Sequence, residues 1–260
     1  MRQIAITLRV PVHERPLERC EGMLVRIKGT AKAAIAVKNS IREDSRKRFT
    51  VAHELGHLLL PGHDQCGVCA SGMIETWAGD VRDREREANV FAAELLMPAA
   101  LMQRQLGRDA PSLRLLDGIA ATFGTSLTAS GYRFASLTSY AVALVWSEAG
   151  RIRWAKQSDE FGGWLRLREK LDSRTFAADL FGGTDVPAGA HPVPADAWLE
   201  RADAEATLLE ESRLLPGYGA VLTLLWAKEA AGGTIAEEEL LEELNPSDFT
   251  TRRRRWPTRR

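Results

Sequence analysis

The sequence is poor in cysteine and has no long apolar run, and each absence excludes a class of protein. Only 3 of its 260 residues are cysteine, an odd, low number that argues for a reducing compartment and against a disulfide framework. No stretch approaches the roughly 20 apolar residues that span a bilayer. The N-terminus also lacks the uninterrupted apolar segment of a secretory signal. These absences predict a cytoplasmic protein without a membrane partner.

An excess of charge of either sign is also missing. Lys+Arg and Asp+Glu number 35 each, so the overall charge points neither to nucleic acid nor to a membrane surface. The hydrophobic fraction of 45% and the charged fraction of 27% are those of an ordinary globular protein. A chain of this length can bury a core without staples, as one large domain or two smaller ones.

Against this background, the His-Glu-x-x-His pattern of residues 53–57 stands out. On an α-helix, residues i and i+4 share a face, so His53 and His57 can offer imidazole nitrogens to one metal ion. Glu54 lies one step round the helix, where it can reach a water on that ion without ligating it. Zinc accepts neutral imidazole, and a catalytic zinc site keeps one position open for water. Another divalent metal such as manganese is the alternative.

The elements around this motif can also be read from the sequence. Residues 23–27 and 33–37 are β-rich and predict two short strands. A strand edge beside a metal-site helix can align an extended peptide over the metal, while a purely structural hairpin is the alternative. Asp44 or Ser45 is the expected N-cap of the motif helix, and Pro61-Gly62 is expected to end it.

A second amphipathic helix is predicted from Asp83, as its N-cap, to Pro98. Glu85 and Asn89 share one face at positions i and i+4. A carboxylate from this helix would complete a His₂Glu site, a set known for catalytic zinc, and Asn89 could then hydrogen-bond to a ligand. Glu87 is the competing ligand, but it points about 200° away from Glu85 round the helix.

A further set of metal-type residues follows the first helix as His63-x-x-Cys66-x-x-Cys69. A structural zinc site needs four ligands, and no fourth is evident nearby. Reduced cysteines in a loop are therefore the favoured interpretation.

Two long motifs occur in a fixed order between residues 20 and 98. They read Arg48-Phe49-Thr50-x-Ala52-His53-Glu54-x-Gly56-His57 and Glu85-x-x-Ala88-Asn89-x-Phe91-Ala92-Ala93-x-Leu95-Leu96-Met97-Pro98. Together they resemble the ImmA/IrrE family of metallopeptidases. Many members carry a longer first helix than the residues ahead of Met23 allow, and the sequence departs from the family pattern there.

The resemblance implies a zinc site and a protein substrate. It implies zinc held by His53, His57 and Glu85, with Glu54 as catalytic base, on a gluzincin-like core of strands and helices. The known substrates of the family are helix-turn-helix transcriptional repressors, cleaved to release a stress-response or mobile-element regulon. The partner expected for this chain is therefore such a repressor.

Residues 113–137 resemble a helix-turn-helix, with Gly124 at the turn and Ser126 capping the second helix. DNA binding would need basic residues on that second helix, because phosphate contacts dominate DNA affinity. The second helix has only Arg133. A helical pair that packs on the peptidase core or docks a substrate is favoured, and direct DNA binding is the alternative. The same motif occurs in members of the family.

The remainder of the chain predicts a separate α+β domain. Strands are expected at residues 140–146, 151–155 and 220–226, and helical stretches at 161–171 and 195–214. By its position in the chain and its pattern of expected strands and helices, the domain resembles the sensor-like C-terminal domain of the IrrE branch. The strand tryptophans are expected in its core, namely Trp146, Trp154 and Trp226.

The fold class predicted for the whole chain is α+β, with a zincin-like metallopeptidase core. The expected divisions are a metallopeptidase domain at 1–110, the helix-turn-helix-like segment at 111–139, the C-terminal domain at 140–245 and a basic mobile tail at 246–260. Charge runs like the tail are usually solvated ends, and nonspecific contact with nucleic acid is the alternative.

The function predicted is that of a zinc-dependent endopeptidase that cleaves a helix-turn-helix repressor. The alternative is a DNA-binding or regulatory scaffold that keeps a structural metal. Glu54 favours the enzyme, since a structural site needs no base. Peptide hydrolysis also needs a donor for the oxyanion, for which His63, Tyr132 and backbone amides are open candidates.

Overall fold

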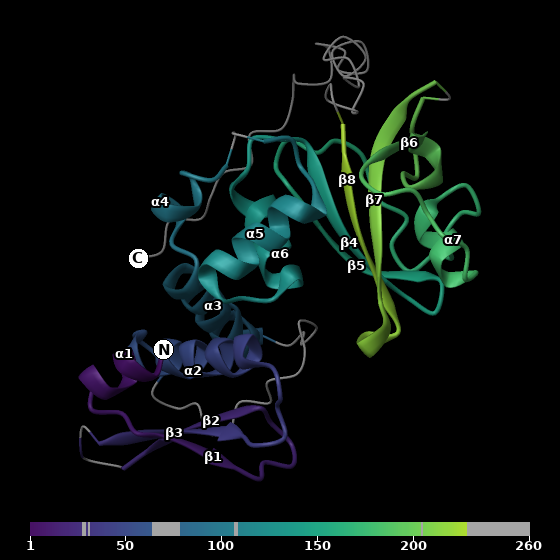
Figure 1. Cartoon of the computed structure of the whole chain (residues 1–260). Coiled ribbons are helices and arrows are strands. Elements are labelled where there is room, and N and C mark those ends of the chain that lie inside the picture. The colour runs from purple at the N-terminus through teal and green to yellow at the C-terminus, as the bar shows by residue number, and fades with distance from the viewer. Residues whose placement is uncertain (28–29, 31, 64–78, 107–108, 204, 228–260) are drawn as a thin grey trace, which may run out of the picture. The chain divides into compact units, whose positions relative to one another are not determined.

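The computed structural model describes residues 1–260 except 28–29, 31, 64–78, 107–108, 204 and 228–260. Within these residues the chain is a mixed α+β protein with a three-stranded and a five-stranded sheet (Figure 1). It forms two compact units: Met1–Leu144 with Lys156–Ser158, and Val145–Ala155 with the described residues from Asp159 onward. None of the described helices has the length and apolar character that crossing a membrane requires.

The N-terminal unit begins with a short helix and a three-stranded sheet. These elements are α1 (Arg2–Thr7), β1 (Val12–Arg15), β2 (Gly22–Arg26) and β3 (Ala33–Lys38). The strand order is β1-β3-β2, with β1 parallel and β2 antiparallel to β3, so β2 forms one edge. The two predicted strands are confirmed as β2 and β3. Helix α1 and strand β1 were not predicted; the short, polar β1 depends on its parallel pairing with β3.

One face of this sheet packs on helix α2 (Asp44–Leu59), which carries the motif (Figure 1). The shared core consists of Val10, Leu24, Ile35, Val37, Ile41, Val51 and Leu55. On β2 the side chains alternate in burial, as the period of a strand requires. The sheet and α2 therefore form the base on which the motif residues are held.

Helix α2 begins earlier than predicted. Its N-cap is Glu43, and the backbone N–H groups of Arg46 and Lys47 donate to the Glu43 carbonyl at 3.1 Å. The expectation of Asp44 or Ser45 as the N-cap is wrong. Asp44 lies instead in the first turn, where its charge is favoured by the helix dipole. The predicted end is confirmed, since α2 stops at Leu59, just before Pro61-Gly62.

Helix α3 runs from Gly79 to Leu96. The predicted N-cap, Asp83, is therefore wrong, because Asp83 lies inside the helix, four residues after its start. The predicted end is confirmed, since α3 stops at Leu96, just before Pro98. Pro98 is the N-cap of the next helix, α4 (Ala99–Met102). Ala88, Ala92 and Leu96 are buried along one face, as the amphipathic pattern predicts.

The predicted helical pair is present as α5 (Leu113–Phe123) and α6 (Leu127–Leu137). Gly124 ends α5 in the left-handed conformation, at φ 61°, which glycine adopts without steric cost. The Ser126 hydroxyl accepts a hydrogen bond from the backbone N–H of Ala129 at 3.1 Å. Both predicted terminal signals, the turn glycine and the capping serine, are confirmed.

The five-stranded sheet has the order β5-β4-β8-β7-β6. Its strands are β4 (Val142–Glu148), β5 (Arg151–Gln157), β6 (His191–Pro194), β7 (Thr207–Leu215) and β8 (Ala220–Trp226). The accompanying short helices are α7 (Phe176–Phe181), η1 (Ala195–Ala197) and η2 (Pro216–Tyr218). The strands predicted near β4, β5 and β8 are confirmed.

The helical stretches predicted for the C-terminal region are wrong. Residues 161–171 form no helix and make only isolated β-bridges. Of the described residues between 195 and 214, only those of η1 are helical, and β7 occupies the last part. The β7 sequence is rich in Leu and Glu, which favour helices, but its antiparallel pairing with β8 overrides that preference. The short helix α7 was missed.

Two further expectations concern the tryptophans and segments outside the described residues. Trp146 and Trp154 are half-buried and stack on each other with ring centroids 5.9 Å apart. Trp226 is also half-buried, so the three tryptophans lie at the margin of the core and not fully inside it. Among the tryptophans that the structure describes, Trp198 is the one that is fully buried. Cys66, Cys69 and the tail at 246–260 lie outside the described residues.

Glu210 is the central polar group of the C-terminal unit. It is fully buried, and burial raises the pKa of its carboxyl. Its oxygens accept hydrogen bonds from the backbone N–H of Ala177 at 2.7 Å, the Ser212 hydroxyl at 2.7 Å and the Trp198 indole at 2.9 Å. One carboxylate thus ties α7 and Trp198 to β7.

Glu210→Ala is expected to destabilise the protein by about 3 kcal/mol, because it leaves two buried N–H donors without an acceptor. Urea unfolding followed by tryptophan fluorescence measures this loss. The matched control is Glu160→Ala, which removes a carboxylate from an exposed position and is expected to change stability by less than about 0.5 kcal/mol. Equal stability of the two variants would contradict the role assigned to Glu210.

Candidate metal centre

Helix α2 presents two histidines side by side. His53 and His57 are buried, and their Nε2 atoms lie 3.1 Å apart. The i, i+4 spacing produces this arrangement directly, because both side chains project from one face of the helix. Two imidazole nitrogens therefore meet at one point in the interior of the N-terminal unit.

Helix α3 adds a carboxylate to the same point. It can approach α2 closely because Gly56 has no side chain: a Cβ there would lie 3.1 Å from the Ala88 Cα. Glu85 Oε2 lies 3.2 Å from His53 Nε2, and Glu85 Oε1 lies 3.4 Å from His57 Nε2. The candidate ligand atoms of these three residues all lie within 4.8 Å of one another.

The donor set fits a divalent metal. Two imidazoles and one carboxylate match the His₂Glu set of catalytic zinc sites. Burial opposes ionisation of Glu85, but the adjoining imidazoles of His53 and His57 outweigh it and hold the pKa of the Glu85 carboxyl well below its usual range. Glu85 is therefore a charged ligand at neutral pH, as a metal requires.

Asn89 holds the far side of His53. The His53 Nδ1 and the Asn89 Oδ1 lie 2.9 Å apart. Because an amide oxygen only accepts, this contact places the proton on Nδ1 and leaves the Nε2 lone pair directed at Glu85 and His57. The structure thus brings Asn89 next to His53, as the i, i+4 spacing from Glu85 predicts.

Glu54 lies beside this cluster without a partner of its own. Its exposed fraction is 0%, and neither carboxylate oxygen accepts a hydrogen bond of normal geometry from the described residues, the backbone N–H of Leu24 being the nearby donor. Burial raises the pKa of the Glu54 carboxyl to about 7, although the nearby His53 imidazole and the backbone N–H of Leu24 oppose the shift. A buried carboxyl without donors is costly, so its presence needs an explanation.

These residues lie within a segment that matches a known family. Residues 8–135 match the IrrE N-terminal-like domain of the M78 peptidases, and this match includes both helices of the cluster. The segment of residues 8–135 belongs to the ImmA/IrrE family. The predicted resemblance is thereby confirmed.

Two curated relatives of the IrrE-like chain come from Deinococcus. The Radiation response metalloprotease IrrE of Deinococcus deserti is 32% identical over 196 residues, which cover 71% of this chain and 65% of the relative. The protein of the same name from Deinococcus radiodurans is 32% identical over 162 residues, which cover 59% of this chain and 48% of the relative. The chain thus spans less than two thirds of the length of either relative.

In the IrrE-like domain, Gly22 sets the space around Glu54. Gly22 opens β2, and a Cβ at this position would lie 2.5 Å from Glu54 Oε1 and 2.5 Å from Thr50 Cγ2. Any side chain there would therefore displace the Glu54 carboxyl. The sequence alone does not single out Gly22, because a glycine at a strand start is informative only once the opposing helix is in place.

His63 was also missed in the role that the structure gives it. Its Nδ1 lies 2.8 Å from the His57 Nδ1, and its Nε2 lies 2.9 Å from the Glu87 Oε2. Both ring nitrogens are thus engaged on the side of His57 that faces away from the cluster. His63 is therefore not available as an oxyanion donor. Glu87, the competing ligand in the sequence analysis, contacts His63 rather than the cluster.

Tyr132, the other candidate oxyanion donor, lies on α6 and is 46% exposed. The Lys156 ammonium lies 5.7 Å from the centre of its ring. Its assignment as an oxyanion donor stays a prediction.

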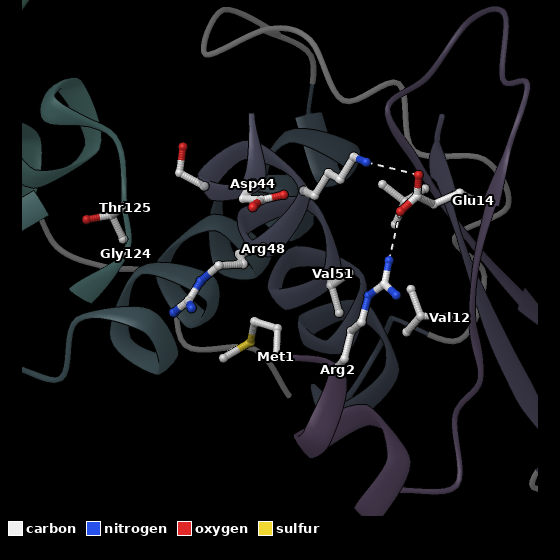
Figure 2. A pocket seen from close by; sticks show the side chains of 12 residues that line it. Met1, Arg2, Val12, Glu14, Asp44, Arg48, Val51, Gly124 and Thr125 are labelled. Atoms are coloured by element: carbon white, nitrogen blue, oxygen red, sulfur yellow. Dashed lines mark hydrogen bonds and ion pairs between the residues drawn. The ribbon is translucent and has the colours of Figure 1, made fainter. Parts of the chain in front are cut away.

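A pocket of about 570 Å³ lies elsewhere in the IrrE-like domain (Figure 2). Its charged lining is largely paired, since Glu14 binds Arg2 at 2.7 Å and Lys47 at 2.9 Å. Arg48 also lines it and donates to the Phe123 carbonyl at 3.0 Å, at the end of α5. At about 100° per residue, Arg48 lies on the side of α2 opposite to the two histidines. The motif arginine therefore anchors α5, and the pocket is separate from the metal centre.

Proposed function

We propose that the chain is a zinc-dependent endopeptidase in which His53, His57 and Glu85 hold the metal and Glu54 is the catalytic base. The observation that carries this proposal is the buried, unpartnered carboxyl of Glu54 beside three converging ligand atoms. A purely structural metal site has no use for such a carboxyl. The names of the two Deinococcus relatives also support a metalloprotease.

Glu54 carries the proton transfers of the proposed reaction. A bound zinc ion supplies a Lewis acid, which lowers the pKa of a bound water from about 15.7 to about 7. Glu54 accepts a proton from the water that attacks the scissile carbonyl, and then delivers it to the leaving amine. Because no donor holds either Glu54 oxygen, the carboxylate is free to accept the proton. Asn89 keeps the His53 ring oriented during these steps.

Strand β2 is the proposed guide for the substrate backbone. It forms an edge of the sheet and passes Glu54 at Gly22. The Arg26 guanidinium donates to the backbone carbonyl of His57, which fixes β2 against the C-terminal part of α2. An extended peptide paired with this edge would lie next to the base and the ligands.

The proposed substrate is a helix-turn-helix transcriptional repressor, and its cleavage would switch on a stress-response or mobile-element regulon. Membership of the ImmA/IrrE family supports this substrate class, and the radiation response named for the two relatives supports a stress regulon. The proposed core is zincin-like, and the proposed C-terminal domain at 140–245 is sensor-like.

Direct DNA binding by the helical pair is not favoured. Arg133, the basic residue of α6, donates from Nε to the Met97 carbonyl at 3.1 Å and from its guanidinium to Glu94. Its side chain is 13% exposed, so it is committed to packing within the N-terminal unit. A docking or packing role for α5 and α6 agrees with these contacts.

Chelation tests the proposed activity. Dialysis against a metal chelator is expected to stop cleavage of a purified helix-turn-helix repressor, and one equivalent of zinc is expected to restore it, because Glu54 alone cannot activate water. Appearance of repressor fragments on a gel measures the rate. A serine-protease inhibitor, the matched control, is expected to leave the rate unchanged. Cleavage that continues in the metal-free protein would refute metal-dependent hydrolysis.

A further inference from the structure

We propose that His63 and Glu87 are positioning residues that hold His57 in the orientation and tautomer required of a metal ligand. This inference rests on the proposed metal site. It concerns a second set of contacts behind that site, which connects the end of α2 to α3. Neither residue touches the point where the three candidate ligand atoms converge.

The direction of the hydrogen bonds follows from chemistry. Glu87 is a carboxylate and only accepts, so the nitrogen facing it, His63 Nε2 at 2.9 Å, carries a proton. The other nitrogen of a neutral His63 ring is then an acceptor. It faces the His57 Nδ1 at 2.8 Å, so His57 donates its Nδ1–H. His57 therefore donates a hydrogen bond to His63, and His63 donates one to Glu87.

This direction of donation leaves the Nε2 atom of His57 unprotonated. With the proton on Nδ1, the Nε2 lone pair points at the cluster, where it lies 3.1 Å from His53 Nε2 and 3.4 Å from Glu85 Oε1. The opposite tautomer would place a proton where a metal must bind. The contact with His63 therefore selects the tautomer that can ligate, as partners behind ligand histidines generally do.

Residues of α3 thus support both candidate histidine ligands, one by a direct hydrogen bond and the other through His63. Asn89 of α3 accepts directly from His53 at 2.9 Å. Glu87 of α3 reaches His57 only through His63. Glu85, Glu87 and Asn89 therefore act as one unit, because any shift of α3 moves the carboxylate ligand and both supports together.

The local backbone explains how His63 reaches this position. Gly62 follows α2 with φ +77°, a left-handed conformation that only glycine adopts without strain. A Cβ at Gly62 would meet nothing within 4 Å, so glycine is needed here for its backbone and not for space. The turn returns the chain onto α2, and His63 is 1% exposed there.

Zinc affinity, measured by competition with a chromophoric chelator, tests the proposal. His63→Leu fills the site but cannot accept from His57, and it is expected to weaken zinc binding by about 10- to 100-fold, the usual effect of losing such a partner. His63→Asn places an amide oxygen near the former Nδ1, and it is expected to restore most of the affinity. A role in packing alone predicts no such difference between Leu and Asn.

Glu87→Ala and Asp83→Ala form the matched pair of surface variants. Both remove one exposed carboxylate from α3, but only Glu87 contacts His63. The Glu87 side chain is 60% exposed, so Glu87→Ala is expected to weaken zinc binding by less than His63→Leu does. Asp83→Ala is expected to bind zinc as the wild type does. This pair leaves the buried ring in place and decides the question if His63→Leu fails to fold.

A spectroscopic measurement follows the hydrogen bond itself. In the zinc-loaded wild type, the Nδ1–H proton of His57 is expected as a downfield, slowly exchanging NMR signal. It should move upfield or exchange away in His63→Leu and return in His63→Asn.

Zinc-binding results separate the inference from the metal site on which it rests. If the wild type binds zinc, Glu85→Ala loses it and all His63 and Glu87 variants bind as the wild type does, the positioning role is refuted and the site stands. A wild type that binds no zinc refutes both.

Discussion

Glu54→Gln is expected to keep zinc bound while cleavage of the repressor falls by about 10²- to 10⁴-fold, the range that a general acid–base contributes. Glutamine has nearly the same shape but cannot accept the proton of the attacking water. Zinc content by elemental analysis and the initial rate of cleavage, measured on the same preparation, separate the two effects. The contrast of intact metal and lost turnover identifies a base rather than a ligand.

Glu43→Gln is the matched control for this variant. It makes the same chemical change on the same helix, at an exposed N-cap whose side chain makes no capping hydrogen bond. Its rate is expected to equal that of the wild type. Unchanged cleavage by Glu54→Gln would exclude the proposed mechanism, and loss of zinc would mean that Glu54 supports the metal.

Stability gives an independent view of Glu54. A buried carboxyl without hydrogen-bond donors opposes folding, so the metal-free Glu54→Gln protein is expected to unfold at a urea concentration no lower than that of the wild type. Residues retained against stability are typical of functional sites. A structural role would predict the opposite result, a clear loss of stability.

Local rules account for what the sequence could predict. The spacing of His53 and His57 places them together by helix geometry alone, and Gly124 with Ser126 predicts the turn between α5 and α6. Glu85 and Asn89 required the pairing of two helices, which the family resemblance supplied. Each of these features depends on residues within one element or on a long motif.

What the sequence could not predict depends on contacts between distant segments. Gly22 matters only because β2 packs against Glu54, and His63 matters only because Gly62 turns the chain back onto α2. The helix predicted over β7 failed for the same reason, since pairing with β8 outweighs the helical preference of its residues. Side-chain composition alone carries none of this information.

Glu85→Ala is expected to weaken zinc binding by more than the roughly 100-fold limit of an outer partner, because it removes a charged ligand. Its carboxylate is the part of the cluster that bridges both imidazoles, at 3.2 and 3.4 Å. Competition with a chromophoric chelator measures the loss, and cleavage of the repressor should fall with it. Without Glu85 only two neutral imidazoles remain, too few for a stable zinc site.

The order of the four zinc affinities tests the ligand assignment and the proposed support together. From strongest to weakest binding, we expect Asp83→Ala at the wild-type level, then Glu87→Ala, then His63→Leu, and Glu85→Ala last. Three of these changes remove one carboxylate from α3, so net charge cannot explain a difference among them. If Glu87→Ala lost zinc as completely as Glu85→Ala, Glu87 would be a ligand, and the geometry that places it against His63 at 2.9 Å would not describe the metal-bound protein.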